Sequence, residues 1–160
     1  MHGPCHRGAR SCVSTSTIFR RNILEYNDSL CTATCGIVED QDHLHFTCAF
    51  YNQLCLLILG WLGFSTALHG SLIQHFTQFR GLEGFSNKSR LAYNLIWISI
   101  LFSIWKDHNT RHFHNKMEQI SSLLKKVKLQ AYWWLKSYYA IFDFEHTVWR
   151  LTPLFYAFRL

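Results

Sequence analysis

Residues 31–48, CTATCGIVEDQDHLHFTC, place four metal-ligand side chains within a short polar stretch. These are Cys31, Cys35, His43 and Cys48, in the pattern Cys-x3-Cys-x7-His-x4-Cys. Structural zinc takes four cysteine or histidine donors in a tetrahedron, and two cysteines a few residues apart can bind one side of it. Because protein side chains fill all four positions, the pattern predicts a structural Zn2+ and leaves no coordination position for a catalytic water.

Two details of this stretch bear on the ligand set. Gly36 follows the first cysteine pair and permits the tight turn that would bring the backbone over the metal. His45 could replace His43 as the fourth ligand, although the x4 spacing to Cys48 favours His43. The x3 gap between the first cysteines is looser than the commoner x2, so chance clustering of ligand-type residues is the alternative to a metal site.

Three further cysteines, Cys5, Cys12 and Cys55, raise the question of disulfides. Disulfides persist in oxidising compartments, but the amino terminus MHGPCHRGARSC has no apolar stretch behind its basic residues. We therefore expect an intracellular protein, nuclear or cytoplasmic and not secreted. Cys55 lies in an apolar segment and is interpreted as a small buried residue, whereas Cys5 and Cys12 have no clear partner.

The rest of the chain predicts a mainly α fold, in which a small zinc-stapled loop precedes a helical bundle with two long C-terminal helices. Hydrophobic residues make up 49% of the sequence and charged residues 16%, against roughly 25% charged in an average soluble domain. That composition provides more apolar surface than a small domain can bury alone. The expected divisions are a poorly ordered lead-in at 1–16, a zinc-binding domain at 17–80, a loop at 81–88, a helical hairpin at 89–140 and an aromatic tail at 141–160.

Apolar periodicity places the individual helices. They are expected at about 17–24, 49–59, 71–79, 89–106 and 113–139. The helix at 71–79 should bury one face, formed by Leu72, Ile73, Phe76 and Phe79. The helix at 113–139 should bury a stripe formed by Ile120, Leu123, Leu124, Val127, Ala131, Trp134, Leu135 and Tyr138.

The apolar run at 91–105 could be mistaken for a membrane span. It has 15 residues, is interrupted by Asn94 and is followed by Lys106 and Asp107. Because a spanning helix needs about 20 apolar residues, we expect a buried helix wrapped by neighbours. A small membrane-associated protein is the less favoured alternative.

The sequence offers no recognisable catalytic template. It contains neither a glycine-rich phosphate loop nor a His-Glu-x-x-His helix. Asp107, His108, His112 and His114 are close in sequence, but we expect them at a helix break in a solvated segment, not in a second metal or catalytic site. The chain is therefore expected to have no enzymatic activity of its own.

Charge is distributed unevenly along a chain whose net charge is +6. Residues 31–48 carry Glu39, Asp40 and Asp42 without a lysine or arginine, which disfavours phosphate binding there. If RNA or DNA is a partner, the contacts are expected on the basic segment downstream, from Lys116, Lys125, Lys126, Lys128 and Lys136, with Tyr132 and Trp133 available to stack on bases. An ordinary solvated helix face is the alternative for these lysines.

Three separated motifs occur in an order typical of one family. They are the 31–48 stretch, WLGF at 61–64 and LIWISILFSIWKDHNTRHFHNK at 95–116. With KVKLQAYWWLK at 126–136, they resemble the zinc-binding domain that follows the polymerase in plant non-LTR (LINE-type) retrotransposon reverse transcriptases, particularly the legume copies. The family's His-Leu-Phe step corresponds to His43-Leu44-His45, so His45 replaces the usual phenylalanine. Its tryptophan motif corresponds to Ile104-Trp105-Lys106 with Asn109 and Phe113.

The resemblance covers about residues 17–152 and carries expectations about function. It implies a non-catalytic zinc-binding domain that binds element RNA or target DNA, or that supports the polymerase. The polymerase and endonuclease cores of such proteins are absent, so we expect a truncated copy whose missing polymerase portion would cover the excess apolar surface. A structural or interaction relic without independent activity is the alternative.

Overall fold

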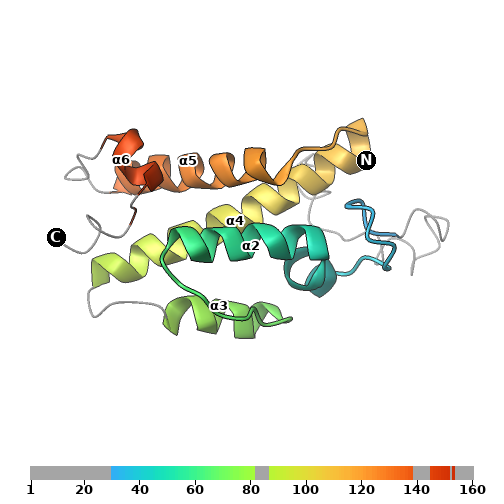
Figure 1. The fold of residues 1–160 in the computed structure, drawn as a ribbon, viewed down its shortest axis with the longest axis horizontal. Coiled ribbons are helices and arrows are strands. Elements are labelled where there is room, and N and C mark those ends of the chain that lie inside the picture. The colour runs from blue at the N-terminus through green and yellow to red at the C-terminus, as the bar shows by residue number, and fades with distance from the viewer. Residues whose placement is uncertain (1–29, 82–86, 139–144, 152, 154–160) are drawn as a thin grey trace, which may run out of the picture.

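The computed structural model describes residues 30–81, 87–138, 145–151 and 153 (Figure 1). Its helical elements are η3 (His43–Thr47), α2 (Ala49–Trp61), α3 (Leu72–Gly81), α4 (Asn87–His114), α5 (Ile120–Tyr138) and α6 (His146–Leu151). The described residues form no sheet, and the one antiparallel bridge among them joins Leu30 to Val38. The prediction of a mainly α fold, with the Cys/His segment before a helical bundle, is confirmed. Cys5, Cys12, the lead-in at 1–16 and the helix expected at 17–24 lie outside the described residues.

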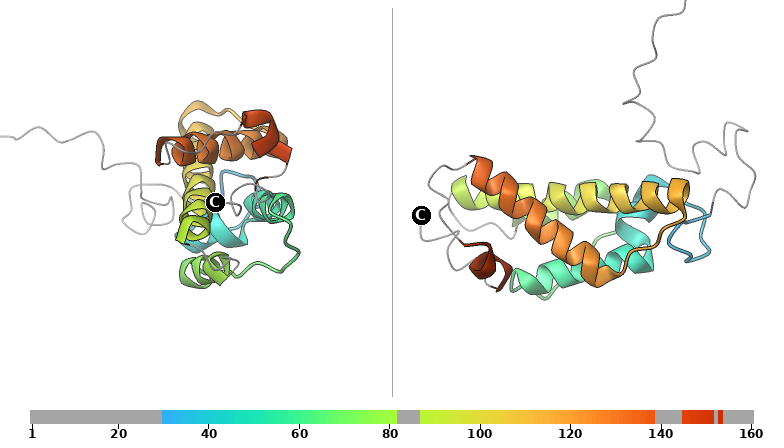
Figure 2. Two further views of the ribbon diagram at one scale, coloured as in Figure 1. Left: turned by 90° about the vertical axis from the view of Figure 1, so that its left-hand side faces the viewer. Right: turned by 90° about the horizontal axis from the view of Figure 1, so that it is seen from above.

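The bundle is built around α4 and α5. Helix α4 packs against α3 and α5, and α5 also packs against α2 and α6. Figure 1 shows α2 between α3 and α5, with α4 crossing behind them, and Figure 2 shows the same helices from two further sides. Their buried side chains include Leu54, Ile58, Ile96, Ile100, Leu123 and Val127. Residues 30–48 lie at the end of the bundle where α2 begins and α4 ends (Figures 1 and 2).

Helix α4 runs further than the sequence predicted. The expected break after Lys106 is absent, and α4 continues to His114, while α5 begins at Ile120 instead of about residue 113. The residue that follows α4, Asn115, has φ 49° and donates its N–H to the Arg111 carbonyl at 3.1 Å, as a left-handed residue after a helix commonly does. Asp107 and Arg111 pair at i,i+4 and are buried, so tertiary contacts carry the helix through a segment expected to be solvated.

The buried face of α3 also differs from the prediction. Leu72 and Ile73 are exposed, Ile73 by 76%, whereas His75 and Phe79 are buried. Their rings stack at 5.6 Å, and the Trp97 Nε1–H donates to His75 Nδ1 at 2.9 Å. Hydrophobicity alone predicted that Leu72 and Ile73 face inward. His75 is buried instead, because Trp97 of α4 supplies a hydrogen-bond donor to its ring.

The stripe predicted on α5 is largely correct. Leu123, Val127, Ala131 and Leu135 are buried, although Tyr138 at the end of the helix is exposed. None of the described helices is long and apolar enough to cross a membrane.

Helix α6, in the segment expected to be an aromatic tail, covers the far end of α5. Its buried Trp149 meets Trp61 edge to face at 5.1 Å and donates its Nε1–H to the Lys128 carbonyl at 2.8 Å. These contacts join α2, α5 and α6 at the end of the bundle opposite the cysteine segment.

Candidate metal centre

The first two candidate ligands lie on a small hairpin. The Leu30–Val38 bridge closes it, and Cys31 donates its N–H to the Ile37 carbonyl at 2.9 Å. The chain reverses through Thr34 and Gly36, whose φ angles are 63° and 77°. Positive φ is accessible to glycine and costs a threonine free energy, so the predicted role of Gly36 in a tight turn is borne out by its backbone conformation. This reversal brings the Cys35 side chain back toward Cys31.

The other two ligands are brought together by one wide helical turn. Cys48 donates its N–H to the His43 carbonyl at 2.8 Å, an i→i+5 bond that defines the π-helical η3. In an α-helix, residues five apart differ by about 140° around the axis and would point apart. The wider π turn brings them round toward the same side, and such turns occur frequently at functional sites. Asp40 begins this segment by accepting the His43 N–H at Oδ1, 2.7 Å away.

The four ligand atoms lie within 4.8 Å of one another. The Cys31 and Cys48 sulfurs are 3.7 Å apart, and His43 Nε2 is 3.1 Å from Cys35 Sγ. Ordinary zinc bond lengths in a tetrahedron give about 3.8 Å between two sulfurs and about 3.6 Å between sulfur and nitrogen. The cluster therefore has the donor types, donor number and spacing to hold a metal ion such as zinc.

The choice between the two histidines follows from where their rings point. His45 donates from Nδ1 to the Gln41 carbonyl at 3.1 Å, on the exposed side of the turn, and is not part of the cluster. His43 is buried, and its Nδ1 lies 3.3 Å from the Thr47 hydroxyl. An Nδ1–H donated to Thr47 leaves the Nε2 lone pair directed at the sulfurs, the tautomer that a metal requires.

The two buried sulfurs are electrostatically unequal. The Cys31 thiol donates to the Cys48 sulfur and, with backbone N–H groups at the start of α2, lowers the pKa of Cys48, although burial opposes this. The same hydrogen bond and burial raise the pKa of Cys31. Of the two cysteines, Cys48 therefore ionises more readily to the thiolate, the form that binds metals.

A buried polar network on α4 holds the hairpin against the bundle. His108 Nδ1 lies 3.1 Å from the Thr32 hydroxyl and 3.3 Å from Glu39 Oε2. Glu39, counted above among the acidic residues of the loop, is fully buried and accepts the Thr32 N–H at 3.4 Å. The segment from Asp107 to His108 was expected to be solvated, and that expectation is wrong because the hairpin covers it.

The neighbouring Asp107 extends the network to α2 and to the connection between α4 and α5. Its Oδ2 accepts hydrogen bonds from the Tyr51 hydroxyl at 2.9 Å and from Arg111 Nε at 2.6 Å. Arg111 in turn donates to the Glu118 carbonyl at 2.9 Å and lies over the Phe50 ring at 4.3 Å. Asp107 was expected to be solvated, and Tyr51 and Arg111 were not among the predicted site residues, although the i,i+4 spacing of Asp107 and Arg111 is a helix-stabilising pattern that could have indicated a continuous helix.

The lysines predicted to contact nucleic acid do not form one uniform face. Lys116 lies in the connection between α4 and α5, and Lys125, Lys126 and Lys136 are exposed on α5. Lys126 is ion-paired with Glu118.

The fifth lysine, Lys128, is half-buried at the junction with α2 and α6. Its Nζ lies 4.7 Å from the Trp61 ring centroid, and burial, with the nearby Arg150, lowers its pKa. Lys128 therefore packs within the protein instead of presenting its charge freely.

The two aromatic residues proposed for stacking have opposite environments. Tyr132 is only 3% exposed and contacts Trp149 and His146, so the expectation that it could stack on a base is wrong. Trp133 is 53% exposed, with Lys136 Nζ 5.9 Å from its ring centroid. Only Trp133 of this pair is available to a ligand.

The site is thus a buried Cys3His cluster at the entrance to a small helical domain. Among the described residues, it is the only group of at least three His, Cys, Asp or Glu side chains placed to hold a metal ion. Comparison with protein-family models, with curated proteins and with solved structures finds no match to this chain.

Proposed function

We propose that this chain is a zinc-stabilised, non-catalytic module of the type that follows the polymerase in LINE-type reverse transcriptases, and that it binds single-stranded nucleic acid. The observation that carries the proposal is the convergence of Cys31, Cys35, His43 and Cys48 within 4.8 Å. In that family the same ligand types precede the tryptophan-containing helix, which corresponds here to α4. Four protein ligands give the metal a structural role, which is to fix the hairpin to the start of α2.

The metal segment itself is a poor phosphate-binding surface. Three thiolates on one Zn2+ leave a charge of about −1. Asp40 and Asp42 are exposed beside it and add negative charge. Nucleic acid should therefore bind elsewhere on the module.

The exposed side of α5 supports that contact better. Lys125 and Lys136 are eleven residues apart, which places them on the same side of the helix about 16 Å from each other. Trp133 is exposed within about 80° of both around the helix axis. Cations that attract phosphates and an aromatic ring on which a base can stack are the parts that proteins use for single strands.

The test is salt-dependent binding of a fluorescent single-stranded RNA to the zinc-loaded protein. Replacing Lys125 and Lys136 by glutamine should weaken binding and reduce the slope of log K against log salt by about 1.4, since each phosphate contact on a single strand contributes about 0.7. Lys128→Gln is the matched control, because this lysine packs against Trp61. Binding that is equally strong and equally salt-dependent in the double variant would contradict the assignment.

A second candidate function, a purely structural support for a polymerase, is favoured by the exposed apolar residues. On the described surface these include Leu56, Leu57, Leu72, Ile73 and Ile98. This candidate predicts poor solubility of the isolated chain and no RNA affinity beyond nonspecific charge. Light scattering on the Leu56→Ser/Leu57→Ser variant tests it: a monodisperse variant beside an aggregating wild type would support a covered interface, and equal behaviour would argue against it.

A further inference from the structure

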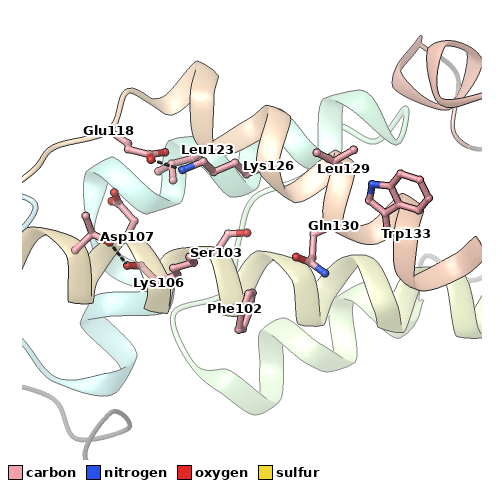
Figure 3. Close-up of a pocket in the computed structure, with 11 residues that line it drawn as sticks. Phe102, Ser103, Lys106, Asp107, Glu118, Leu123, Lys126, Leu129, Gln130 and Trp133 are labelled. Carbon is pink, nitrogen blue, oxygen red and sulfur yellow. Dashed lines mark hydrogen bonds and ion pairs between the residues drawn. The ribbon is translucent and has the colours of Figure 1, made fainter. Parts of the chain in front are cut away.

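A cleft of about 240 Å3 lies between α4 and α5 (Figure 3). That volume is below the roughly 300–1,000 Å3 of pockets for drug-sized ligands, so its occupant should be small, of the order of one base. The polar and aromatic side chains that line it include Ser103, Lys106 and Asp107 from α4, Glu118 from the connection between the helices, and Lys126, Gln130 and Trp133 from α5.

Asp107 provides an unused acceptor in the wall of this cleft. The residue is 4% exposed, and both hydrogen bonds described above, from Tyr51 and Arg111, end on its Oδ2. Its Oδ1 is buried and has no hydrogen-bond partner among the described residues. Leaving a buried carboxylate oxygen unpaired costs free energy, which a ligand N–H would recover.

Trp133 provides the second element at the other end of the cleft. Figure 3 shows Asp107 near one end of the lining residues and Trp133 at the opposite end, with Ser103 and Gln130 between them. Lys126, which lies seven residues before Trp133 and about 10 Å from it along the helix, is ion-paired with Glu118, which also lines the cleft. Lys106 is exposed at the rim, where it can meet a phosphate.

We propose that the cleft receives one base of a single strand, which directs an amino group to Asp107 Oδ1, while a second base of the same strand stacks on Trp133 at the opposite end. The proposal rests on the proposed function and adds a base preference to it. Cytosine presents an exocyclic amino group to such an acceptor, whereas uracil presents a carbonyl oxygen at the same position. The site therefore favours amino-bearing bases and rejects uracil, because two acceptors would face each other.

The test compares fluorescent oligo(rC) and oligo(rU) of equal length by anisotropy with the zinc-loaded full chain. Wild type should bind oligo(rC) more tightly. Trp133→Ala should weaken binding by roughly 5- to 150-fold, as expected for loss of a stacked base, and Trp133→Phe should retain most of it. Tyr138→Ala is the control, since this exposed aromatic is on the same helix but does not line the cleft.

Asp107→Asn tests the acceptor. Tyr51 and Arg111 both donate, so the amide oxygen should take the Oδ2 position and turn the NH2 group into the cleft. The preference should then shift toward oligo(rU), whose carbonyl can accept from that group. Circular dichroism and zinc content show whether this variant folds; if it does not, Trp133→Ala and Lys106→Ala, judged against Tyr138→Ala and Lys128→Gln, decide the question.

The outcomes separate the cleft from the general function. If both oligonucleotides bind equally and Trp133→Ala behaves like Tyr138→Ala, the cleft proposal is overturned and RNA binding through Lys125 and Lys136 on α5 stands. If neither oligonucleotide binds, both proposals are overturned. A cytosine preference that is lost in Trp133→Ala, and reversed in a folded Asp107→Asn, supports the cleft as the site of base recognition.

Discussion

Replacing Cys48 by alanine should abolish metal binding and remove the stability that depends on it. The side chain is fully buried, with its sulfur 3.7 Å from that of Cys31. A metal held by this cluster links Cys31 to Cys48 and closes a loop of 18 residues. Without it, the hairpin and the π turn lose the link between them.

The size of the effect follows from that loop. Closing an 18-residue loop by a cross-link reduces the entropy of the unfolded chain by an amount worth about 3 kcal/mol. Apparent zinc-binding energies of about 10–16 kcal/mol set the upper limit. Removal of the metal should therefore lower the free energy of unfolding by at least about 3 kcal/mol, which for a chain of this length corresponds to a fall in Tm of roughly 6–12 °C.

The assay is urea denaturation followed by circular dichroism, with and without a chelator, together with the metal content of the purified protein. Cys55→Ala is the matched control, because Cys55 is equally buried but lies outside the cluster. Wild type and Cys55→Ala should contain one zinc per chain and lose stability on chelation, and Cys48→Ala should show neither property. Either of two results would refute a metal site here: Cys48→Ala retains one zinc per chain, or the wild type contains no zinc and its stability is unchanged by the chelator.

Three further predictions follow from single contacts. Thr47→Val should weaken zinc binding about 10- to 100-fold, because it removes the hydroxyl 3.3 Å from His43 Nδ1; competition with a chromophoric chelator measures this, and unchanged affinity would count against the assigned tautomer. Tyr51→Phe should lower the free energy of unfolding by about 1.5–3 kcal/mol, since it removes a buried hydrogen bond of 2.9 Å to a carboxylate, whereas Tyr138→Phe on the surface should not. Burial lowers the pKa of His75 from 6.5 to about 4, so the unfolded chain binds a proton there that the folded chain does not. Its contribution to stability should be complete above pH 6.5 and be lost toward pH 4, by up to about 1.4 kcal/mol per pH unit; a flatter denaturation profile for His75→Gln would confirm it, and an identical profile would refute it.

The candidate site was more predictable than its surroundings. Ligand types and spacings are local properties, so Cys31, Cys35, His43 and Cys48 could be selected from 18 consecutive residues. The buried stripe of α5 was predictable for a similar reason, since helical periodicity reports which side of a strongly amphipathic helix is apolar.

Other features depended on partners far away in the sequence. Ile73 is exposed and His75 buried because Trp97, on another helix, donates to the imidazole. Tyr132 and Trp133 are adjacent aromatic residues that the sequence does not distinguish. Tyr132 is buried because α6 packs over α5, whereas Trp133 is exposed. No pattern within either helix contains that information.

The sequence by itself determined the helical class, the three candidate cysteine ligands and the acidic character of residues 31–48, because each depends on residue type and short-range spacing. The tertiary structure decided that His43 and not His45 faces the sulfurs, through a π turn whose i→i+5 hydrogen bond brings His43 and Cys48 together. It also decided that Asp107, His108 and Arg111 are buried, because charged groups can be buried only where the rest of the fold supplies their partners.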